Sequence, residues 1–505
     1  MLSSVRSIAR HAREDGTRMA LRDPDLELTY GELAVRVGGF LTAASDLPDT
    51  VGLMAENSVA WAIADLGLSA VGRTLVPLPP QFSDQQLGYI ARDSGVEAVL
   101  ADAVNAGRAA TLGAPVRLLD AMCARAGTFN PDTPTVRSRG VNRIIYTSGT
   151  TGAPKGVRLG PAQIDFMARA LAGAVGATRD DRYMSVLPLA MLLEQFGAIH
   201  VPVLVGGESC LVPSVAGAVG RGQPGDIAGA ARAIRPTFTV IVPALLRLWM
   251  AGLAPGENVE GLRHVAVGGA HTAPRLIGAS WQRGIPVHEG YGLSECCSVV
   301  ALNRPGENMP GTVGRPLDGV GVEIAADGEV VVSGPSVMTG YLGAADIGGR
   351  WATGDLGALD EAGRLTIRGR RDTALVTEFG RNVSPEWIES LFMADPRVAR
   401  SAITLVPGVG LTALIGLTAD GEAWAHEAGA GAGELIAAQV CADAPEYARP
   451  KAGIARPVAE LAAAGVLQSG GRVDRAKATT LAGTLLHKRL LPGSGSETTI
   501  RQEAV

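Results

Sequence analysis

The sequence predicts an α/β protein, with a large N-terminal domain of stacked α/β layers, a small antiparallel β-region and a smaller α+β C-terminal domain. In the N-terminal part, short apolar runs alternate with helix-length amphipathic segments, and clear runs are residues 51–54, 144–146, 239–242 and 265–267. Such runs are typical of parallel strands covered by helices on both faces. From Val320 onward, apolar and polar residues alternate around glycine turns at 326–328 and 361–363, which predicts antiparallel hairpins.

The predicted C-terminal domain begins after Asp372. Ser384, Pro385 and Glu386 form a helix start, because serine caps exposed amides, proline suits the first helical position and an acidic residue suits the first turn. Residues 475–490 could form a short terminal helix. We therefore expect domains at 1–370 and 371–480, and a flexible tail at 481–505, whose last part is rich in Gly, Ser, Thr and charge.

Composition excludes several classes of protein. Lys and Arg total 45 against 50 Asp and Glu, with no basic block, so we expect no nucleic-acid partner. No apolar stretch reaches the roughly 18 residues that span a bilayer, and the N-terminus lacks the apolar core of a secretory signal. Five cysteines without a Cys-x-x-Cys pair argue against a disulfide framework or structural zinc, and a cytoplasmic location is expected. They are Cys123, Cys210, Cys296, Cys297 and Cys441.

The most informative segment is residues 146–157, Tyr-Thr-Ser-Gly-Thr-Thr-Gly-Ala-Pro-Lys-Gly-Val, which follows an apolar strand. Glycines allow tight turns that direct amides at phosphate oxygens, and hydroxyls and a lysine add donors and charge. It is not a Walker loop, because Lys155 lies between Pro154 and Gly156. An ordinary polar turn is the alternative to a triphosphate cradle. The expected phosphate-binding residues are Thr147, Ser148, Gly149, Thr150, Thr151, Gly152 and Lys155.

This segment resembles the phosphate loop of the adenylate-forming superfamily, which includes acyl-CoA synthetases, nonribosomal adenylation domains and luciferases. Further stretches resemble the superfamily's motifs in the same order, from about residue 20 to 476: residues 28–33, 289–295, 351–355 and 369–372. Residues 380–386 resemble the lid loop of free-standing long- and medium-chain acyl-CoA synthetases. Several spaced motifs in order are more specific than any one of them.

The resemblance implies roles for individual residues. Glu295 would hold Mg²⁺, Ser294 would bind the α-phosphate, and Tyr291 would stack on adenine. Taken alone, residues 291–295 could equally be a capped helix start. Asp355 would accept both ribose hydroxyls, because an ionised carboxylate only accepts hydrogen bonds. Other residues implied at the nucleotide are Gly269, Ala270, Glu289, Gly290, Gly292 and Arg370, and Asp372 matches the hinge about which a C-terminal lid rotates between two half-reactions.

The implied acyl pocket departs from the superfamily pattern. Met191 stands where acyl-CoA synthetases commonly have histidine or an aromatic residue, and it could line a hydrocarbon pocket or fill the core. Glu194 in an apolar run could be a helix surface residue, an amine-recognising group or a general base. The expected pocket residues are Met191, Leu192, Glu194, Gly268 and Gly269.

A second departure concerns the catalytic lysine of the lid. The matching stretch, residues 470–475, places Arg472 at that position. A planar guanidinium does not place its charge where an ammonium does. Arg472 could substitute adequately, Lys477 could take over, or the adenylation step could have relaxed demands. We favour Arg472 as the catalytic cation, beside Lys155, Ser294 and Glu295.

The function that follows is ATP-dependent adenylation of a small carboxylic acid to acyl-AMP and pyrophosphate, then transfer to CoA, with ATP, Mg²⁺ and CoA as cofactors or co-substrates. One alternative is an adenylate-forming enzyme with an unusual acceptor or oxyanion, such as a carrier-protein thiol, an amine, or nitrite in a diazotisation. Another is a non-catalytic AMP- or acyl-binding protein. The sequence leaves substrate identity, acceptor and oligomeric state open.

Overall fold

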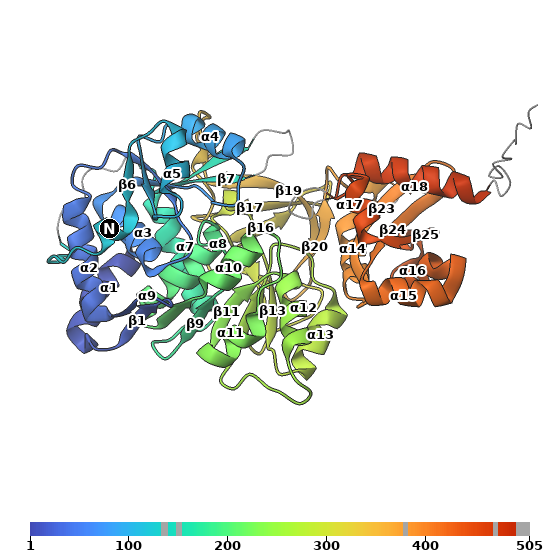
Figure 1. Cartoon of the computed structure of the whole chain (residues 1–505), viewed down its shortest axis with the longest axis horizontal. Coiled ribbons are helices and arrows are strands. Elements are labelled where there is room, and N and C mark those ends of the chain that lie inside the picture. Colours follow the sequence, from blue (N-terminus) through green and yellow to red (C-terminus); the bar gives the residue numbers. More distant parts are fainter. Residues whose placement is uncertain (133–139, 148–153, 377–381, 468–472, 491–505) are drawn as a thin grey trace, which may run out of the picture. The chain divides into compact units, whose positions relative to one another are not determined.

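The computed structural model describes residues 1–132, 140–147, 154–376, 382–467 and 473–490. The chain forms two compact units, Met1–Ile367 and Arg368–Val505 (Figure 1). The first unit contains two large sheets, which confirms the predicted α/β architecture. Within the described residues, no helix is long and apolar enough to cross a membrane. All five cysteines are buried free thiols.

The larger sheet of the first unit has nine strands, with a parallel centre and antiparallel strands at both ends. In sheet order the strands are β15 (Arg315–Pro316), β14 (Ala301–Leu302), β13 (Val287–Tyr291), β12 (His264–Val267), β11 (Phe238–Ile241), β9 (Arg182–Ser185), β10 (Glu208–Leu211), β1 (Met19–Arg22) and β2 (Glu27–Thr29). The predicted runs at 239–242 and 265–267 thus fall on β11 and β12.

The second sheet has seven strands. In order they are β18 (Gly340–Tyr341), β8 (Lys155–Leu159), β7 (Arg143–Thr147), β4 (Thr74–Pro77), β3 (Thr50–Met54), β5 (Ala98–Ala101) and β6 (Val116–Leu118). Its central parallel strands β3, β4 and β5 are buried on both faces: Val51 and Leu53 belong to the main core, whereas Met54 packs with Leu87 and Ile90 of α4 on the opposite face. Burial on both faces explains why these strands are uninterrupted apolar runs.

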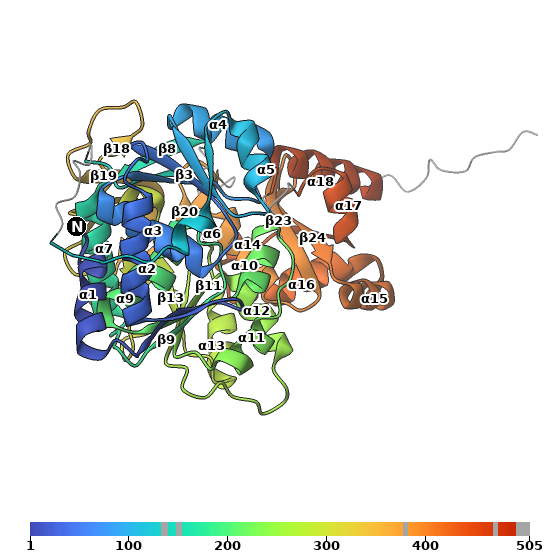
Figure 2. The ribbon, with the colours of Figure 1, turned by 60° about the vertical axis from the view of Figure 1, so that its left-hand side comes forward.

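Helices fill the space between the two sheets and cover their outer faces (Figures 1 and 2). Those between the sheets include α2 (Tyr30–Ala43), α3 (Val59–Val71) and α7 (Pro161–Ala174), with α1 (Ser3–Asp15) and α9 (Val201–Val205) beside them. The other helices of this unit are α4 (Asp84–Asp93), α5 (Ala106–Ala109), α6 (Leu119–Cys123), α8 (Leu192–Gln195), α10 (Pro213–Gly220), α11 (Ile227–Ile234), α12 (Pro243–Gly252) and α13 (Pro274–Gln282).

The predicted antiparallel region forms a four-stranded sheet of β16 (Gly321–Ile324), β17 (Glu329–Ser333), β19 (Arg350–Leu359) and β20 (Leu365–Arg370). β16 and β17 pair antiparallel across the expected turn, where Gly328 has a φ of 87°. Glycine adopts this left-handed conformation without a Cβ penalty.

The second unit is built on a three-stranded sheet of β23 (Val398–Val406), β24 (Gly410–Leu417) and β25 (Ala452–Pro457), and it also holds the pair β21 (Leu375–Val376) and β22 (Asn382–Val383). α14 (Pro385–Met393) and α16 (Ala432–Val440) pack on one face, with α15 (Ala419–Ala428) following β24; α17 (Val458–Ala463) and α18 (Arg475–Leu490) pack on the other. Ser384 caps α14 as predicted, accepting a hydrogen bond from the Trp387 amide at 3.2 Å.

One boundary differs from the sequence prediction. α18 spans Arg475–Leu490, the range in which a terminal helix was expected, so residues 481–490 belong to this helix and not to the predicted flexible tail. Ala478 and Ala482 are fully buried in a core that Leu485 and Leu486 also contact, and this i, i+4, i+7 and i+8 spacing gives the helix an apolar face. Residues 491–505 lie outside the described part of the chain.

Candidate active site

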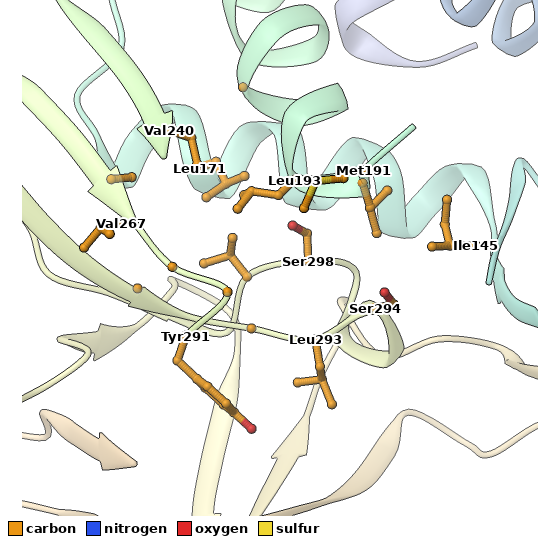
Figure 3. Close-up of a pocket in the computed structure, with 18 of the residues that line it drawn as sticks. Ile145, Leu171, Met191, Leu193, Val240, Val267, Tyr291, Leu293, Ser294 and Ser298 are labelled. Carbon is orange, nitrogen blue, oxygen red and sulfur yellow. The ribbon is translucent and has the colours of Figure 1, made fainter. Parts of the chain in front are cut away.

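A cavity of about 370 Å³ lies in the first unit, at the carboxyl ends of the parallel strands β11, β12 and β13 (Figure 3). This is where α/β sheets generally bind ligands. Leu171, Val175, Phe238 and Val240 belong to its apolar lining. The polar side chains in the lining are Gln81, Tyr146, Tyr291, Ser294 and Ser298. Among the described residues, no charged side chain lines the cavity.

A tight loop after β13 forms one wall of this cavity. It continues through the 3₁₀-helix Ser294–Cys296 to Cys297 and Ser298, whose φ angles are 56° and 94°. A non-glycine residue at positive φ is strained, and such strain is found mainly where the surrounding structure holds it for function. The loop closes on Gly292, because a Cβ there would overlap the backbone carbonyl of Ser298. In Figure 3 the Ser298 hydroxyl points toward Leu193.

Tyr291 and Asp355 meet at the edge of the cavity. The Tyr291 hydroxyl donates a hydrogen bond of 2.5 Å to Asp355 Oδ2, and the ring points away from the apolar side chains of the cavity (Figure 3). Burial, with the nearby Asp355 carboxylate, raises the pKa of Tyr291 above its usual range. The phenol therefore stays protonated and donates to the carboxylate. The residues predicted for adenine and ribose are thus brought together.

Glu295 and Lys155 approach the same side chain, that of Tyr341. The Tyr341 hydroxyl donates to Glu295 Oε1 at 2.8 Å, and Lys155 Nζ lies 5.3 Å from the centroid of the Tyr341 ring. The structure thereby places the predicted magnesium ligand near the lysine predicted to bind phosphate. Sequence reasoning missed Tyr341, because its distance of 46 residues from Glu295 gives no periodic or motif signal.

The strands on either side of the predicted phosphate loop form a hairpin. β7 and β8 pair antiparallel, and Thr147 lies directly opposite Lys155. The predicted phosphate ligands Ser148, Gly149, Thr150, Thr151 and Gly152 lie between these two residues, outside the described part of the chain.

Of the remaining residues predicted to bind the nucleotide in the first unit, two line the cavity, one is exposed and one is buried. Gly269, with a φ of 78°, lines the cavity after β12, and Ala270 next to it is exposed. Gly290 lines the cavity as well. Glu289 is buried below the cavity lining, accepts a hydrogen bond from the Gly311 amide at 3.0 Å, and has its pKa raised to about 8 by burial.

In the second unit, Arg370 Nε lies 3.4 Å from Asp372 Oδ1, the predicted hinge residue. Arg472 lies outside the described residues. Lys477, the alternative catalytic cation, is on α18 with its Nζ 3.7 Å from Asp474 Oδ2. The roles of these residues remain predictions.

The predicted acyl-pocket residues divide into two groups. Met191, Leu192, Gly268 and Gly269 line the cavity. Glu194 does not; it is fully buried behind the lining, where it accepts a hydrogen bond of 3.0 Å from the Tyr183 hydroxyl. Its Oε1 has no hydrogen-bond partner among the described residues. Glu194 is therefore not a helix surface residue.

Burial raises the pKa of Glu194 to about 8, from an ordinary value of 4.5. Because the folded-state pKa lies above the unfolded one, the folded state binds more protons, and stability falls as pH rises from about 4.5 to about 8. Glu194→Gln keeps an acceptor for Tyr183 and removes the charge. We expect it to stabilise the protein by roughly 2–3 kcal/mol at pH 8, and by little at pH 5.

Urea unfolding at both pH values measures this difference. Glu361→Gln, in an exposed turn of the same unit, is the matched control and should change stability at neither pH. An equal effect of Glu194→Gln at pH 5 and pH 8 would show that the buried carboxyl does not titrate in this range.

A buried ionic cluster connects the strand before the phosphate loop to the helices beside the cavity. Arg143 on β7 lies 3.0 Å from Asp65 on α3, and His200 Nε2 lies 3.4 Å from the same carboxylate. Burial alone would raise the pKa of Asp65, but Arg143 and His200 lower it to about 2. Removing one partner of a buried pair leaves an unpaired charge, so we infer that this cluster fixes β7 relative to the helices.

An apolar cavity at the strand ends of an α/β sheet, with a lysine, a partly exposed glutamate and a tyrosine-bound aspartate nearby, is typical of an enzyme site for small molecules. The AMP-binding enzyme family model matches residues 8–342. The chain belongs to the AMP-binding enzyme family.

Individual relatives cover most of the chain. A long-chain fatty acid–CoA ligase of Mycobacterium bovis (strain ATCC BAA-935 / AF2122/97) is 29% identical over 482 residues, covering 79% of this chain and 78% of that protein. An indoleacetate–CoA ligase of Aromatoleum aromaticum (strain DSM 19018 / LMG 30748 / EbN1) is 28% identical over 441 residues, covering 78% of this chain and 84% of that protein.

Solved structures share the fold. The o-succinylbenzoate CoA synthetase of Bacillus subtilis, in complex with its acyl-adenylate intermediate, superimposes with a TM-score of 0.76 at 23% identity, covering 93% of this chain and 97% of that one. The same enzyme in complex with ATP and a magnesium ion gives a TM-score of 0.74 at 22% identity, covering 93% of this chain and 98% of that one.

Proposed function

We propose that this protein is an ATP-dependent, AMP-forming carboxylic acid–CoA ligase. The observation that carries the proposal is the position of Ser294 and Tyr291 in the wall of an apolar cavity, with Glu295, Lys155 and Asp355 around them, in a chain of the AMP-binding enzyme family. An apolar acid in the cavity would then lie next to a nucleotide bound at the loop after β13, which forms one wall of the cavity. CoA ligase relatives that cover more than three quarters of the chain support CoA as the acceptor.

In the first half-reaction, a carboxylate oxygen of the acid attacks the α-phosphorus of ATP, and the bond to pyrophosphate breaks. Asp355 and Tyr291 orient the nucleoside, Ser294 donates its hydroxyl to the α-phosphate, and Lys155 neutralises phosphate charge. In the second half-reaction, the CoA thiolate attacks the acyl carbon and AMP leaves with the oxygen that came from the acid. Each step forms one bond and breaks one.

Glu295 suits a magnesium ligand. Its Oε1 is held by Tyr341, and its Oε2 has no hydrogen-bond partner among the described residues, so one carboxylate oxygen is available to a hard cation. Bound Mg²⁺ would offset the charge on the leaving pyrophosphate. Arg472 is the proposed lid cation for the same charge. We assign the second unit as a lid that turns at Asp372 between the half-reactions.

The cavity supports an acid with an uncharged, apolar acyl group. No charged side chain of the described residues lines it, and Glu194 cannot serve as an amine-binding group in the wall because it lies behind the lining. An unpaired charge in such a cavity costs several kcal/mol. The same lining offers an inorganic anion such as nitrite little to bind, which disfavours diazotisation chemistry.

The experiment is pyrophosphate release with ATP, Mg²⁺ and a panel of acids, with hydroxylamine to trap the acyl-adenylate and CoA omitted or added. We expect kcat/KM for aryl or alkyl acids to exceed that for dicarboxylic and amino acids of similar size by at least about 100-fold. Equal use of charged acids would contradict the assigned acyl class. Adenylation that consumes no CoA, with product only on adding an amine or carrier protein, would contradict CoA as the acceptor.

A further inference from the structure

Tyr341 is held in place by backbone contacts around the phosphate-loop hairpin. It ends β18, where it pairs with Val157 of β8, and the next amide, of Leu342, donates to the Gly156 carbonyl at 2.8 Å. Arg158 Nε donates to the Tyr341 carbonyl at 3.1 Å. The Tyr341 side chain therefore leaves a fixed point of the sheet, beside the strand that begins with Lys155.

The Tyr341 side chain contacts three parts of the nucleotide site. Its hydroxyl donates to Glu295 Oε1 at 2.8 Å, and Lys155 Nζ lies 5.3 Å from the ring centroid. Trp351 packs against the ring edge to face, with centroids 5.7 Å apart, and Trp351 is on β19, the strand that carries Asp355. One side chain thus links the metal carboxylate, the phosphate lysine and the ribose strand.

Tyr341 lies between two residues of opposite charge, Lys155 and Glu295. They adjoin the same side chain, yet no ion pair joins them within 4.0 Å in the described structure. An aromatic face attracts an ammonium, and a phenol donates to a carboxylate, so each charge has an interaction that does not neutralise the other. If the two charges paired directly, that pair would have to break before Mg²⁺ and the triphosphate could bind.

We propose that Tyr341 is a positioning residue that holds Lys155 and Glu295 apart and oriented for the metal–triphosphate complex. The inference rests on the proposed use of ATP, and it is independent of which acid or acceptor the enzyme uses. Groups that orient a metal ligand typically affect metal affinity by about 10- to 100-fold.

The test compares two substitutions. Tyr341→Phe keeps the ring for Lys155 and Trp351 but loses the hydrogen bond to Glu295, whereas Tyr341→Leu loses both. Mn²⁺ binding is measured by electron paramagnetic resonance with a non-hydrolysable ATP analogue, without acid or CoA. We expect Tyr341→Phe to weaken Mn²⁺ binding about tenfold and to leave metal-free binding of the analogue unchanged. Tyr341→Leu should weaken both.

Two controls separate positioning from general loss of structure. Tyr30→Phe removes a buried hydroxyl that donates to the Gly207 carbonyl at 2.7 Å, and it should leave Mn²⁺ affinity unchanged. In a Glu295→Ala background, Tyr341→Phe should have no further effect on Mn²⁺ affinity. If Tyr341→Leu does not fold, the phenylalanine variant and this double-mutant cycle still decide the question.

Wild-type Mn²⁺ affinity in Tyr341→Phe, or an additive effect in the Glu295→Ala background, would overturn the inference while leaving the proposed function intact. Failure of the wild-type protein to bind the ATP analogue at all would instead overturn both.

Discussion

Replacing Glu295 with alanine is expected to slow acyl-adenylate formation by about a thousandfold. The substitution removes the proposed metal-binding carboxylate together with the hydrogen bond that it accepts from the Tyr341 hydroxyl. If Glu295 holds Mg²⁺ as proposed, its loss would remove one of the positive charges that offset the negative charge on the leaving pyrophosphate. Single-turnover formation of acyl-AMP, measured at saturating ATP and acid, reports this step directly.

Glu260→Ala is the matched control, because Glu260 is an exposed glutamate of the same unit. Its single-turnover rate should equal that of the wild-type protein. Raising Mg²⁺ should restore little activity to Glu295→Ala, since the ligand itself is missing. A Glu295→Ala enzyme that forms acyl-AMP within threefold of the wild-type rate would remove Glu295 from the proposed metal site.

Gly292→Ala is expected to be the most damaging change of a single methyl group. A Cβ at this position would overlap the carbonyl oxygen of Ser298, across a loop that already holds Cys297 and Ser298 at positive φ. The loop would have to open, and that would move Tyr291 and Glu295, which lie on either side of Gly292. We expect adenylation to fall by about 100-fold or more, with a loss of stability of about 1–3 kcal/mol.

Gly278→Ala serves as the control for Gly292→Ala. Gly278 lies in α13, and an added Cβ there would meet no atom within 4 Å. Alanine favours helix over glycine by about 1 kcal/mol, so this variant should be at least as stable as the wild-type protein and equally active. Turnover and thermal unfolding of both variants provide the comparison. A fully active Gly292→Ala enzyme would mean that the loop is looser than its packing indicates.

Much of the fold could be predicted because the strands and turns are local features. The runs at 51–54 and 265–267 lie on the strands β3 and β12, and the glycine turns at 326–328 and 361–363 join neighbouring strands of the four-stranded sheet. The bounds of α18 match the terminal helix expected at residues 475–490. What the sequence left open was whether residues 481–490 belong to that helix or to the tail, because this depends on packing of Ala482 and Leu485 against a sheet that is distant in sequence.

The candidate site was also predictable only in part: roles carried by sequence motifs could be predicted, and contacts between distant segments could not. Motif order predicted that Tyr291 and Asp355 serve one nucleotide, and their side chains meet at 2.5 Å. Glu194 remained ambiguous in the sequence, because apolar neighbours do not reveal whether a carboxylate faces a cavity or lies behind its wall. Tyr341 gave no signal at all, since its contact with Glu295 arises only when β18 joins the edge of β8.

In the proposed first half-reaction, a carboxylate oxygen attacks the α-phosphorus of ATP. Its most direct test uses an acid labelled with ¹⁸O in the carboxyl group, with mass spectrometry of AMP and pyrophosphate after complete turnover with CoA. We expect one ¹⁸O atom in AMP and none in pyrophosphate, because the bridging oxygen stays with the phosphorus when AMP leaves. Unlabelled AMP, or label in a phosphate released with ADP, would contradict it.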